Sequence, residues 1–130
     1  MRRRVGILAA GVALSLGSAT GAQAGLSIAV NSAKVLGGFG PVLVVNVTPS
    51  CDASSGVKKL RIAVSERSRK ASGTGETTPT CDGKPHPSDV TVTSQGGALF
   101  KTGGRVDITA DLVTANGLSV SQEFMTRTAE

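Results

Sequence analysis

The stretch VDITADL, from Val106 to Leu112, decides the fold class of this chain. Apolar and polar side chains alternate strictly along it, and a period of two is typical of a strand with one buried face. The stretch LRIAVS at residues 60–65 repeats the alternation. Nothing in residues 25–130 repeats at the 3.6-residue period of an amphipathic helix, so the pattern predicts an all-β domain.

Further strands are predicted on both sides of these two, because short apolar runs alternate with clusters of Gly, Pro, Asn and Asp. They lie around residues 26–30, 33–36, 42–51, 90–92, 99–100 and 118–124, with turns at 37–41, 82–87, 95–97 and 102–104. Residues 65–79 (SERSRKASGTGETTP) are polar and contain two glycines, which predicts a long exposed loop, with an edge strand within residues 76–81.

About seven strands in roughly 100 residues are typical of an immunoglobulin-like (Ig-like) antiparallel β-sandwich, and we predict that fold. The usual residue markers of true Ig domains are absent, since the chain has no Trp and no Tyr. The spacing of its two cysteines is also too short for the inter-sheet bridge of those domains. The expectation therefore depends on strand number and alternation.

Residues 1–24 predict export. Arg2 to Arg4 form a positive segment, Val5 to Leu16 is an apolar run, and Ala22-Gln23-Ala24 places small residues where a signal peptidase reads them. This is the pattern of a secretory signal peptide, which we expect to be helical. A membrane anchor is the alternative, but a spanning helix needs about 20 apolar residues and polar ones interrupt the second half of this segment.

Cleavage is expected between Ala24 and Gly25, which leaves a β-sandwich domain at residues 25–130 with no stable membrane anchor. The protein is therefore expected to be secreted and extracellular, and the abundance of Ala, Gly, Val and Arg suggests a bacterial source. The full chain has 14 basic and 9 acidic residues, and removal of Arg2 to Arg4 leaves 11 basic ones. A nucleic-acid binder needs a concentrated basic surface, with aromatics to stack on bases, so no nucleic-acid partner is expected.

Cys51 and Cys81 are the only cysteines, and an even pair in an exported protein predicts a disulfide. Such a bond would close a loop of about 30 residues and contribute roughly 3–4 kcal/mol by the chain-entropy relation. Cys51 has the same parity as Leu43, Val45 and Val47, so it is expected on the inward face of its strand.

No set of residues predicts catalysis, because a nucleophile, a base and a group that orients the base do not occur together in a recognisable motif. His86 is the only histidine, and with Asp82 and Asp89 it forms a turn typical of solvated side chains. We therefore expect no enzyme activity, no metal and no cofactor. Asp82-Gly83 is expected to be turn chemistry, with glycine supplying a positive φ.

Two other motifs match a functional pattern, but we expect each of them to be ordinary surface structure. Asn46-Val47-Thr48 matches a glycosylation acceptor, but Asn46 is expected on the outer face of a strand, and Pro49 follows the motif. Glu66, Arg67, Arg69 and Lys70 are expected at a charged loop tip. A protease-inhibitor loop would have to be rigid before it binds, whereas this tip is rich in Ser and Gly.

Several short motifs together resemble a group of small secreted bacterial proteins. These are the CDGKPH segment at 81–86, VTV at 90–92, Phe100, Gly104, the strand at 106–112 and the strand at 42–51. Proteins of that group have an Ig-like sandwich, one disulfide and no assigned function, so the resemblance implies a fold and a location but no site residues. A thinner likeness is to the apoproteins that carry enediyne antibiotics, which have two disulfides.

Two function classes remain open. The first is a secreted, non-enzymatic module that binds an unknown extracellular protein or small molecule through loops at one end or an exposed sheet face. The alternative is a carrier of a small apolar ligand in a cleft between the sheets, which a pocket lined by Phe100, Phe124 or Met125 would favour.

The final hairpin contains a conflict between local and global signals. Asn116-Gly117 favours a two-residue turn, which would place the inward Leu112 opposite Ser121. A three-residue loop, Ala115 to Gly117, pairs Leu112 with Val120 and Ile108 with Phe124. Because burial should decide the register more strongly than turn preference, we predict the three-residue loop, with Gly117 in the left-handed conformation.

Overall fold

The computed structural model describes residues 26–68 and 70–130, so the predicted signal peptide and its cleavage point between Ala24 and Gly25 lie outside the described residues. The described chain is all-β, as the period of two predicts. Its strands are β1 (Ser27–Val35), β2 (Phe39–Gly40), β3 (Val42–Ser50), β4 (Val57–Glu66), β5 (Ala71–Thr77), β6 (Ser88–Gln95), β7 (Phe100–Lys101), β8 (Arg105–Thr114) and β9 (Ser119–Thr128), with short 3-10 turns η2 (Leu36–Gly38) and η3 (Ala53–Ser55). None of the described residues forms a helix long and apolar enough to cross a membrane.

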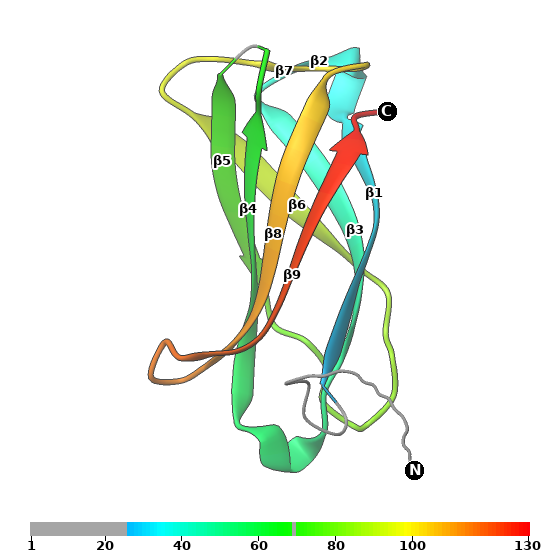
Figure 1. Ribbon diagram of the computed structural model, residues 1–130, viewed down its shortest axis with the longest axis vertical. Helices are drawn as coiled ribbons and strands as arrows, with labels where there is room; N and C mark the ends of the chain where they lie inside the picture. The colour runs from blue at the N-terminus through cyan, green and yellow to red at the C-terminus, as the bar shows by residue number, and fades with distance from the viewer. Residues whose placement is uncertain (1–25, 69) are drawn as a thin grey trace, which may run out of the picture.

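Seven strands form one antiparallel sheet in the order β1-β3-β6-β5-β4-β8-β9, and β2 and β7 form a separate two-stranded ribbon. The sheet curls until its edge strands approach each other, which makes a nearly closed barrel (Figure 1). Two backbone hydrogen bonds join the edges at one end, from Val35 N to Glu130 O and from Glu130 N to Ala33 O, each 2.8 Å long.

The predicted division into two sheets of an Ig-like sandwich is not confirmed, because strand pairing is continuous from β1 to β9. The weakest internal link joins β5 to β6, where only three residue pairs are in register, from Ser72–Gln95 to Thr74–Thr93. Even there β5 and β6 remain paired, so the seven strands form one sheet that curls around the core.

Alternation along the strands builds the core. On β4 the inward residues Leu60 and Ile62 are fully buried, and on β8 Ile108 and Leu112 are fully buried as well. Phe100 of the β2–β7 ribbon is also fully buried and closes one end of the barrel. The interior of the barrel is thus filled by aliphatic side chains and one aromatic ring.

The prediction of a long exposed loop at residues 65–79 is wrong. β4 continues to Glu66, only a four-residue turn follows, and β5 pairs with β4 along its whole length, from Leu60–Thr77 to Glu66–Ala71. Gly73 and Gly75 serve close packing, since a Cβ at either position would overlap a backbone carbonyl oxygen of β6, of Thr93 or Thr91 respectively. Glycine within a strand is typical of such a close backbone approach.

For the final hairpin, the predicted loop length is confirmed and the predicted register is wrong. Thr114 N donates to Leu118 O at 3.0 Å, so the loop has three residues, and Gly117 has a φ of +83°. The predicted register is wrong, because Leu112 lies opposite Ser121. A β-bulge between the Leu112–Ser121 and Val113–Ser119 pairs leaves Val120 without a partner and turns every later residue of β9 to the other face.

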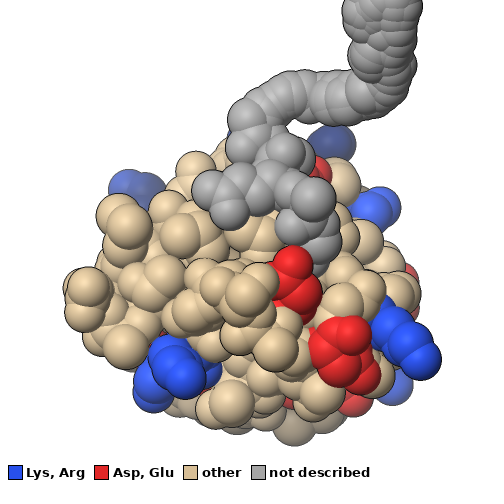
Figure 2. All heavy atoms as spheres, turned by 90° about the horizontal axis from the view of Figure 1, so that it is seen from below, with Lys and Arg blue, Asp and Glu red and all other residues tan. Residues whose placement is uncertain are grey.

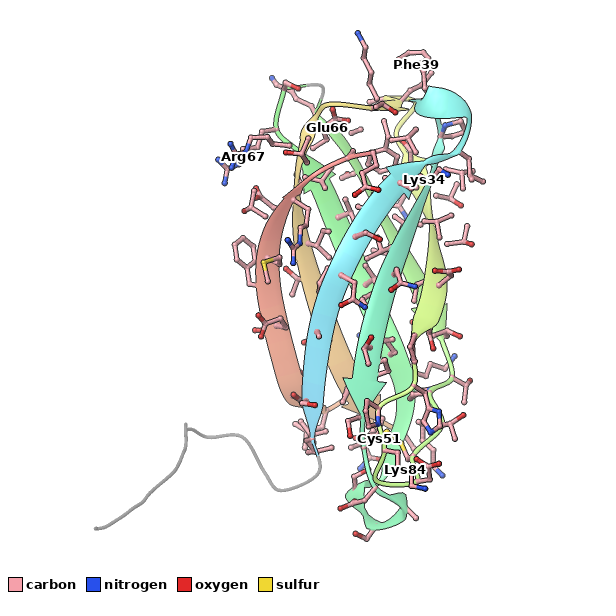
Figure 3. All side chains as sticks on the ribbon, turned by 90° about the vertical axis from the view of Figure 1, so that its right-hand side faces the viewer. Lys34, Phe39, Cys51, Glu66, Arg67 and Lys84 are labelled. Atoms are coloured by element: carbon pink, nitrogen blue, oxygen red, sulfur yellow. A yellow bond between two sulfur atoms is a disulfide. The ribbon has the colours of Figure 1, made fainter. Side chains whose placement is uncertain are left out.

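The disulfide Cys51–Cys81 is present, and Cys51 is fully buried on the inward face, as predicted. It joins the end of β3 to the segment between β5 and β6. We call the end that holds this bond the disulfide pole. The opposite end, with the β2–β7 ribbon, the β4–β5 turn and the C-terminal residues, is the ribbon pole (Figures 1 and 3).

Candidate binding site at the ribbon pole

The β2–β7 ribbon caps the barrel at the ribbon pole. Its register pairs Phe39 with Lys101 and Gly40 with Phe100. Phe100 points into the core, so the ribbon turns the neighbouring side chains outward, and Phe39 is half exposed at 50%. Thr102 N donates to Gly38 O at 2.9 Å, which fastens the end of β7 to the η2 turn.

Two hollows open beside the ribbon and share Ser68 of the β4–β5 turn. The larger, of about 480 Å³, is lined by Phe39, Ser68, Gly97, Ala98 and Leu99. The smaller, of about 300 Å³, is lined by Glu66, Ser68, Lys101, Thr102, Gly103 and Gly104. The two hollows thus adjoin each other at Ser68, and each exposes polar as well as apolar atoms.

Glu66 has an environment unlike that of any other described carboxylate. It is the last residue of β4, it is 1% exposed, and it is the one buried charged side chain among residues 26–68 and 70–130. Neither carboxylate oxygen has a hydrogen-bond partner among the described residues. Figure 3 shows Glu66 pointing into the barrel end, whereas Arg67 points outward.

Gly104 provides the space that the Glu66 carboxylate occupies. A Cβ at position 104 would overlap Oε2 and lie 2.6 Å from Cδ of Glu66. The backbone of Gly104 does not have a positive φ, so the fold does not need glycine there for its conformation. The turn around Gly104 is held in place, because Gly103 N donates to Ala129 O and Ala129 N donates to Gly104 O, each at 2.8 Å.

Two cations lie near this carboxylate without pairing with it. Arg127 shares the inward face, since the register pairs Glu66 with Val106 and Val106 with Arg127. Its Nη2 donates instead to Val30 O at 2.9 Å, across the seam between β9 and β1, whereas its Nε is buried and, like the two oxygens of Glu66, has no hydrogen-bond partner among the described residues. Lys101 lines the same hollow as Glu66, but its side chain is exposed, and no ion pair between the two occurs in the described chain.

The outer surface next to Glu66 is ion-paired. Arg67 Nε donates to Asp107 Oδ2 at 2.8 Å and Nη2 donates to Oδ1 at 3.1 Å, while Thr126 Oγ1 donates to the same carboxylate. The hydrogen bond with Asp107, and then its charge, raise the pKa of Arg67. The hydrogen bonds from Arg67 and then Thr126 lower the pKa of Asp107. Glu66 and Arg67 are consecutive in the chain, and their side chains therefore lie on opposite faces of the sheet.

The sequence-predicted turn at the disulfide pole is held by its own side chains and by two backbone hydrogen bonds to the end of β3, from Gly83 N to Cys51 O and from His86 N to Pro49 O. His86 Nε2 lies 2.9 Å from both oxygens of Asp82, and Lys84 N donates to Asp82 Oδ1 at 3.0 Å. These two contacts, that of His86 first, lower the pKa of Asp82. Gly83 has a φ of +84°, as predicted for this turn. Across the described ranges, no three His, Cys, Asp or Glu residues are grouped so that they could hold a metal ion.

The remaining sequence candidates are dispersed over the molecule. Asn46 Nδ2 donates to Asp89 Oδ1 at 2.8 Å in a polar row on the outer face of β1, β3 and β6. Arg69 lies outside the described residues. The residues proposed for an apolar pocket do not line one together, because Phe100 is fully buried whereas Phe124, at 62%, lies exposed on the outer face of β9.

Glu66 was assigned to a loop tip by sequence reasoning, although a signal for its true position exists. Leu60, Ile62 and Val64 are inward, and Glu66 continues their parity by two more residues. The strand predicted from the apolar residues ends before Glu66, whereas β4 includes it. No family model, curated protein or solved structure matches this chain.

Proposed function

We propose that this protein is a non-enzymatic binding module that holds its ligand at the ribbon pole. The observation that carries the proposal is the pair of adjoining hollows there, one of which borders a buried carboxylate without a partner. Unpartnered buried polar groups are rare in folded proteins, and they concentrate at sites of function. Loops held by a rigid β-scaffold are also the usual place for binding residues.

Two of the four exposed large apolar side chains among the described residues lie at this pole, and the other two, Leu118 and Phe124, lie in the β8–β9 turn and on β9. Leu36 and Phe39, both at least half exposed, lie on η2 and β2 beside the larger hollow. By contrast, Figure 2 shows basic and acidic side chains dispersed over the disulfide pole, with no basic patch over the atoms that it draws in colour. This face of the molecule thus offers no concentrated basic surface of the kind that a nucleic-acid partner needs.

We further propose that the module acts outside the cell after removal of residues 1–24. The support is the tripartite N-terminal pattern in the sequence together with the disulfide, since disulfides persist in oxidising compartments. The likeness to secreted bacterial Ig-like proteins belongs to the same proposal.

The carrier of a small apolar ligand is the second candidate, and the geometry supports it less. The interior of the barrel is filled by side chains that are fully buried, among them Leu43, Leu60 and Ile108. An apolar ligand would therefore have to bind in the open hollow beside Phe39 and Leu99, which is only partly enclosed by apolar residues.

Capture from culture medium and cell envelope tests the proposed function. Residues 25–130 are immobilised, and bound proteins and small molecules are identified by mass spectrometry. Ser68→Trp fills the hollows at their shared residue, and Ser54→Trp places the same side chain on η3 at the disulfide pole as a matched control. A ligand that Ser68→Trp alone releases supports the proposal. A ligand that only Ser54→Trp releases, or no ligand from either source, contradicts it.

A further inference from the structure

We propose that Glu66 is the anionic anchor for an organic cation, a guanidinium or a protonated amine, that enters the smaller hollow of the ribbon pole. This inference rests on the proposed binding function and names the class of ligand. Its geometric basis is the position of Glu66 at the inner end of a hollow whose outer wall is the Lys101–Gly104 turn and Ser68.

The first step is that the buried carboxylate is costly to the fold and is nevertheless accommodated. A charged group without hydrogen bonds is strongly unfavourable in a protein interior. The chain nonetheless keeps Gly104 without a side chain, and any Cβ there would displace the carboxylate. Two positions on different strand ends thus cooperate to hold an unsatisfied group, and a ligand that satisfies it explains both.

The second step is the sign and type of the ligand. Both oxygens of Glu66 lack a donor, and a guanidinium offers two parallel N–H donors to a carboxylate, while an ammonium offers three. A Ca²⁺ ion would need six to eight oxygen ligands, and the described residues group no three acidic, His or Cys side chains in one place. An organic cation therefore fits this site better than a metal ion.

The third step is the neighbourhood of the site. Phe39, Ala98 and Leu99 of the larger hollow begin on the other side of Ser68, so a ligand that reaches Glu66 can also contact these three apolar side chains, which lie among polar backbone atoms. A cation joined to an apolar group is thus the best match for the pair of hollows. A free amine or guanidine and a basic side chain of a peptide present the same chemistry, and the test below distinguishes them.

The route to Glu66 leads past Ser68. The Gly103–Gly104 turn is tied to Ala129 by two hydrogen bonds, whereas Ser68 lies in an exposed four-residue turn. Lys70 in that turn has a φ of +56°, which is an unfavourable conformation for a residue with a side chain.

NMR titration of residues 25–130 tests the proposal with three probes: methylguanidinium, butylammonium and N-acetyl-arginine methylamide. Wild type is expected to bind them with dissociation constants in the millimolar range, which is usual for a single-group ligand. The peptide-like probe will bind several-fold more tightly if the natural ligand is a basic side chain, and no more tightly if it is a free amine or guanidine. Propionate is the anionic counterpart and is expected not to bind.

Two variants of the hollow make the result decisive. Glu66→Gln should weaken cation binding at least tenfold, whereas Glu76→Gln, a matched change of an exposed carboxylate on β5, should leave it unchanged. Lys101→Ala removes a like charge from the rim and should tighten cation binding several-fold. It also guards against misfolding of the Glu66 variant, because Lys101 is exposed.

Equal binding to wild type and Glu66→Gln, absence of cation binding to wild type, or tighter binding of propionate that Lys101→Ala abolishes would overturn the inference. Failure of the capture experiment alone would remove the proposed function and leave the cation site standing. A captured partner that Ser68→Trp releases but Glu66→Gln retains would support the proposed function and overturn the cation site.

Discussion

Replacement of Glu66 by Met should make this protein more stable. Methionine has nearly the length of glutamate, is flexible and unbranched, and presents no polar atoms that need a partner. The side chain at position 66 is 1% exposed, so the substitution exchanges one buried group for another without opening a surface. The free energies of unfolding of wild type and Glu66→Met should therefore differ mainly through the cost of the unsatisfied carboxylate.

The size of the effect follows from the two oxygens without donors. Mutational data assign a penalty of about 1–3 kcal/mol to an unpartnered buried polar group. Glu66→Met should therefore raise the free energy of unfolding by about that amount. For a domain of about 100 residues, a gain of 1 kcal/mol corresponds to an increase in Tm of roughly 4–8 °C.

Urea unfolding followed by far-UV circular dichroism measures this change, with thermal melting as a second observable. Glu76→Met is the control, because Glu76 is exposed and accepts hydrogen bonds from Lys59 and Arg61, each at 3.2 Å. The control should lose stability or leave it unchanged. A loss of 1 kcal/mol or more in Glu66→Met would show that the carboxylate has partners in solution, and the argument for a ligand at Glu66 would fail.

Three further outcomes are expected. Gly73→Ala should destabilise the fold by about 2 kcal/mol, because its Cβ would lie 2.8 Å from the Thr93 carbonyl carbon and force β5 away from β6. The control Ser72→Ala should change the free energy of unfolding by no more than about 0.5 kcal/mol. Equal effects of the two substitutions in urea unfolding would refute the close approach. Trypsin should cut first after Arg67 or Lys70, in the β4–β5 turn, and the fragments should separate on a gel only after reduction of Cys51–Cys81; separation without reductant would refute this. The free energy of unfolding should fall as the pH drops below about 4, because the folded-state pKa values of Glu76, Asp82 and Asp107 are lowered. The stabilisation by each group is complete above its unfolded pKa and is lost as the pH falls through its folded pKa. Asp107→Asn should therefore flatten the acid limb of the stability profile, and an unchanged limb would contradict this.

Alternation of apolar and polar residues was sufficient to predict most strands of the sheet and their inward faces. The inward residues of β4 and β8, the inward Cys51 and its bond to Cys81 all follow from a period of two and from the even number of cysteines. These are properties of single strands and pairs, which a sequence records directly. The order of the strands depends on partners far apart in the chain, and the single continuous sheet could not be derived in the same way.

Two errors have a common physical origin, which is tertiary packing that overrides a local signal. Gly73 and Gly75 have the composition of a loop, but they belong to a strand that another backbone approaches closely. The Val120 bulge allows the three-residue loop and yet restores the register of the shorter turn. It leaves Phe124 on the outside and brings Arg127 to the inward face, where Nη2 bonds to Val30 of β1.

The candidate site was missed for a different reason. Glu66 carries a charge, and a charged residue next to Arg67 suggests a solvated turn. Its parity with Leu60, Ile62 and Val64 indicated burial, but only the position of Gly104 on another part of the chain shows that the interior has room for the carboxylate. A buried charge at a strand end is visible in the sequence only if parity is trusted over polarity.

A map of amide chemical shifts tests most directly the central claim that Glu66 makes the ribbon pole a binding site for an organic cation. Uniformly ¹⁵N-labelled residues 25–130 are titrated with N-acetyl-arginine methylamide, and the shifted amides are placed on the structure. The account predicts saturable shifts at residues 36–40, 66–68 and 97–104, and none in the disulfide pole at 52–56 and 81–87. Saturable shifts centred on the disulfide pole, or none anywhere, would contradict it.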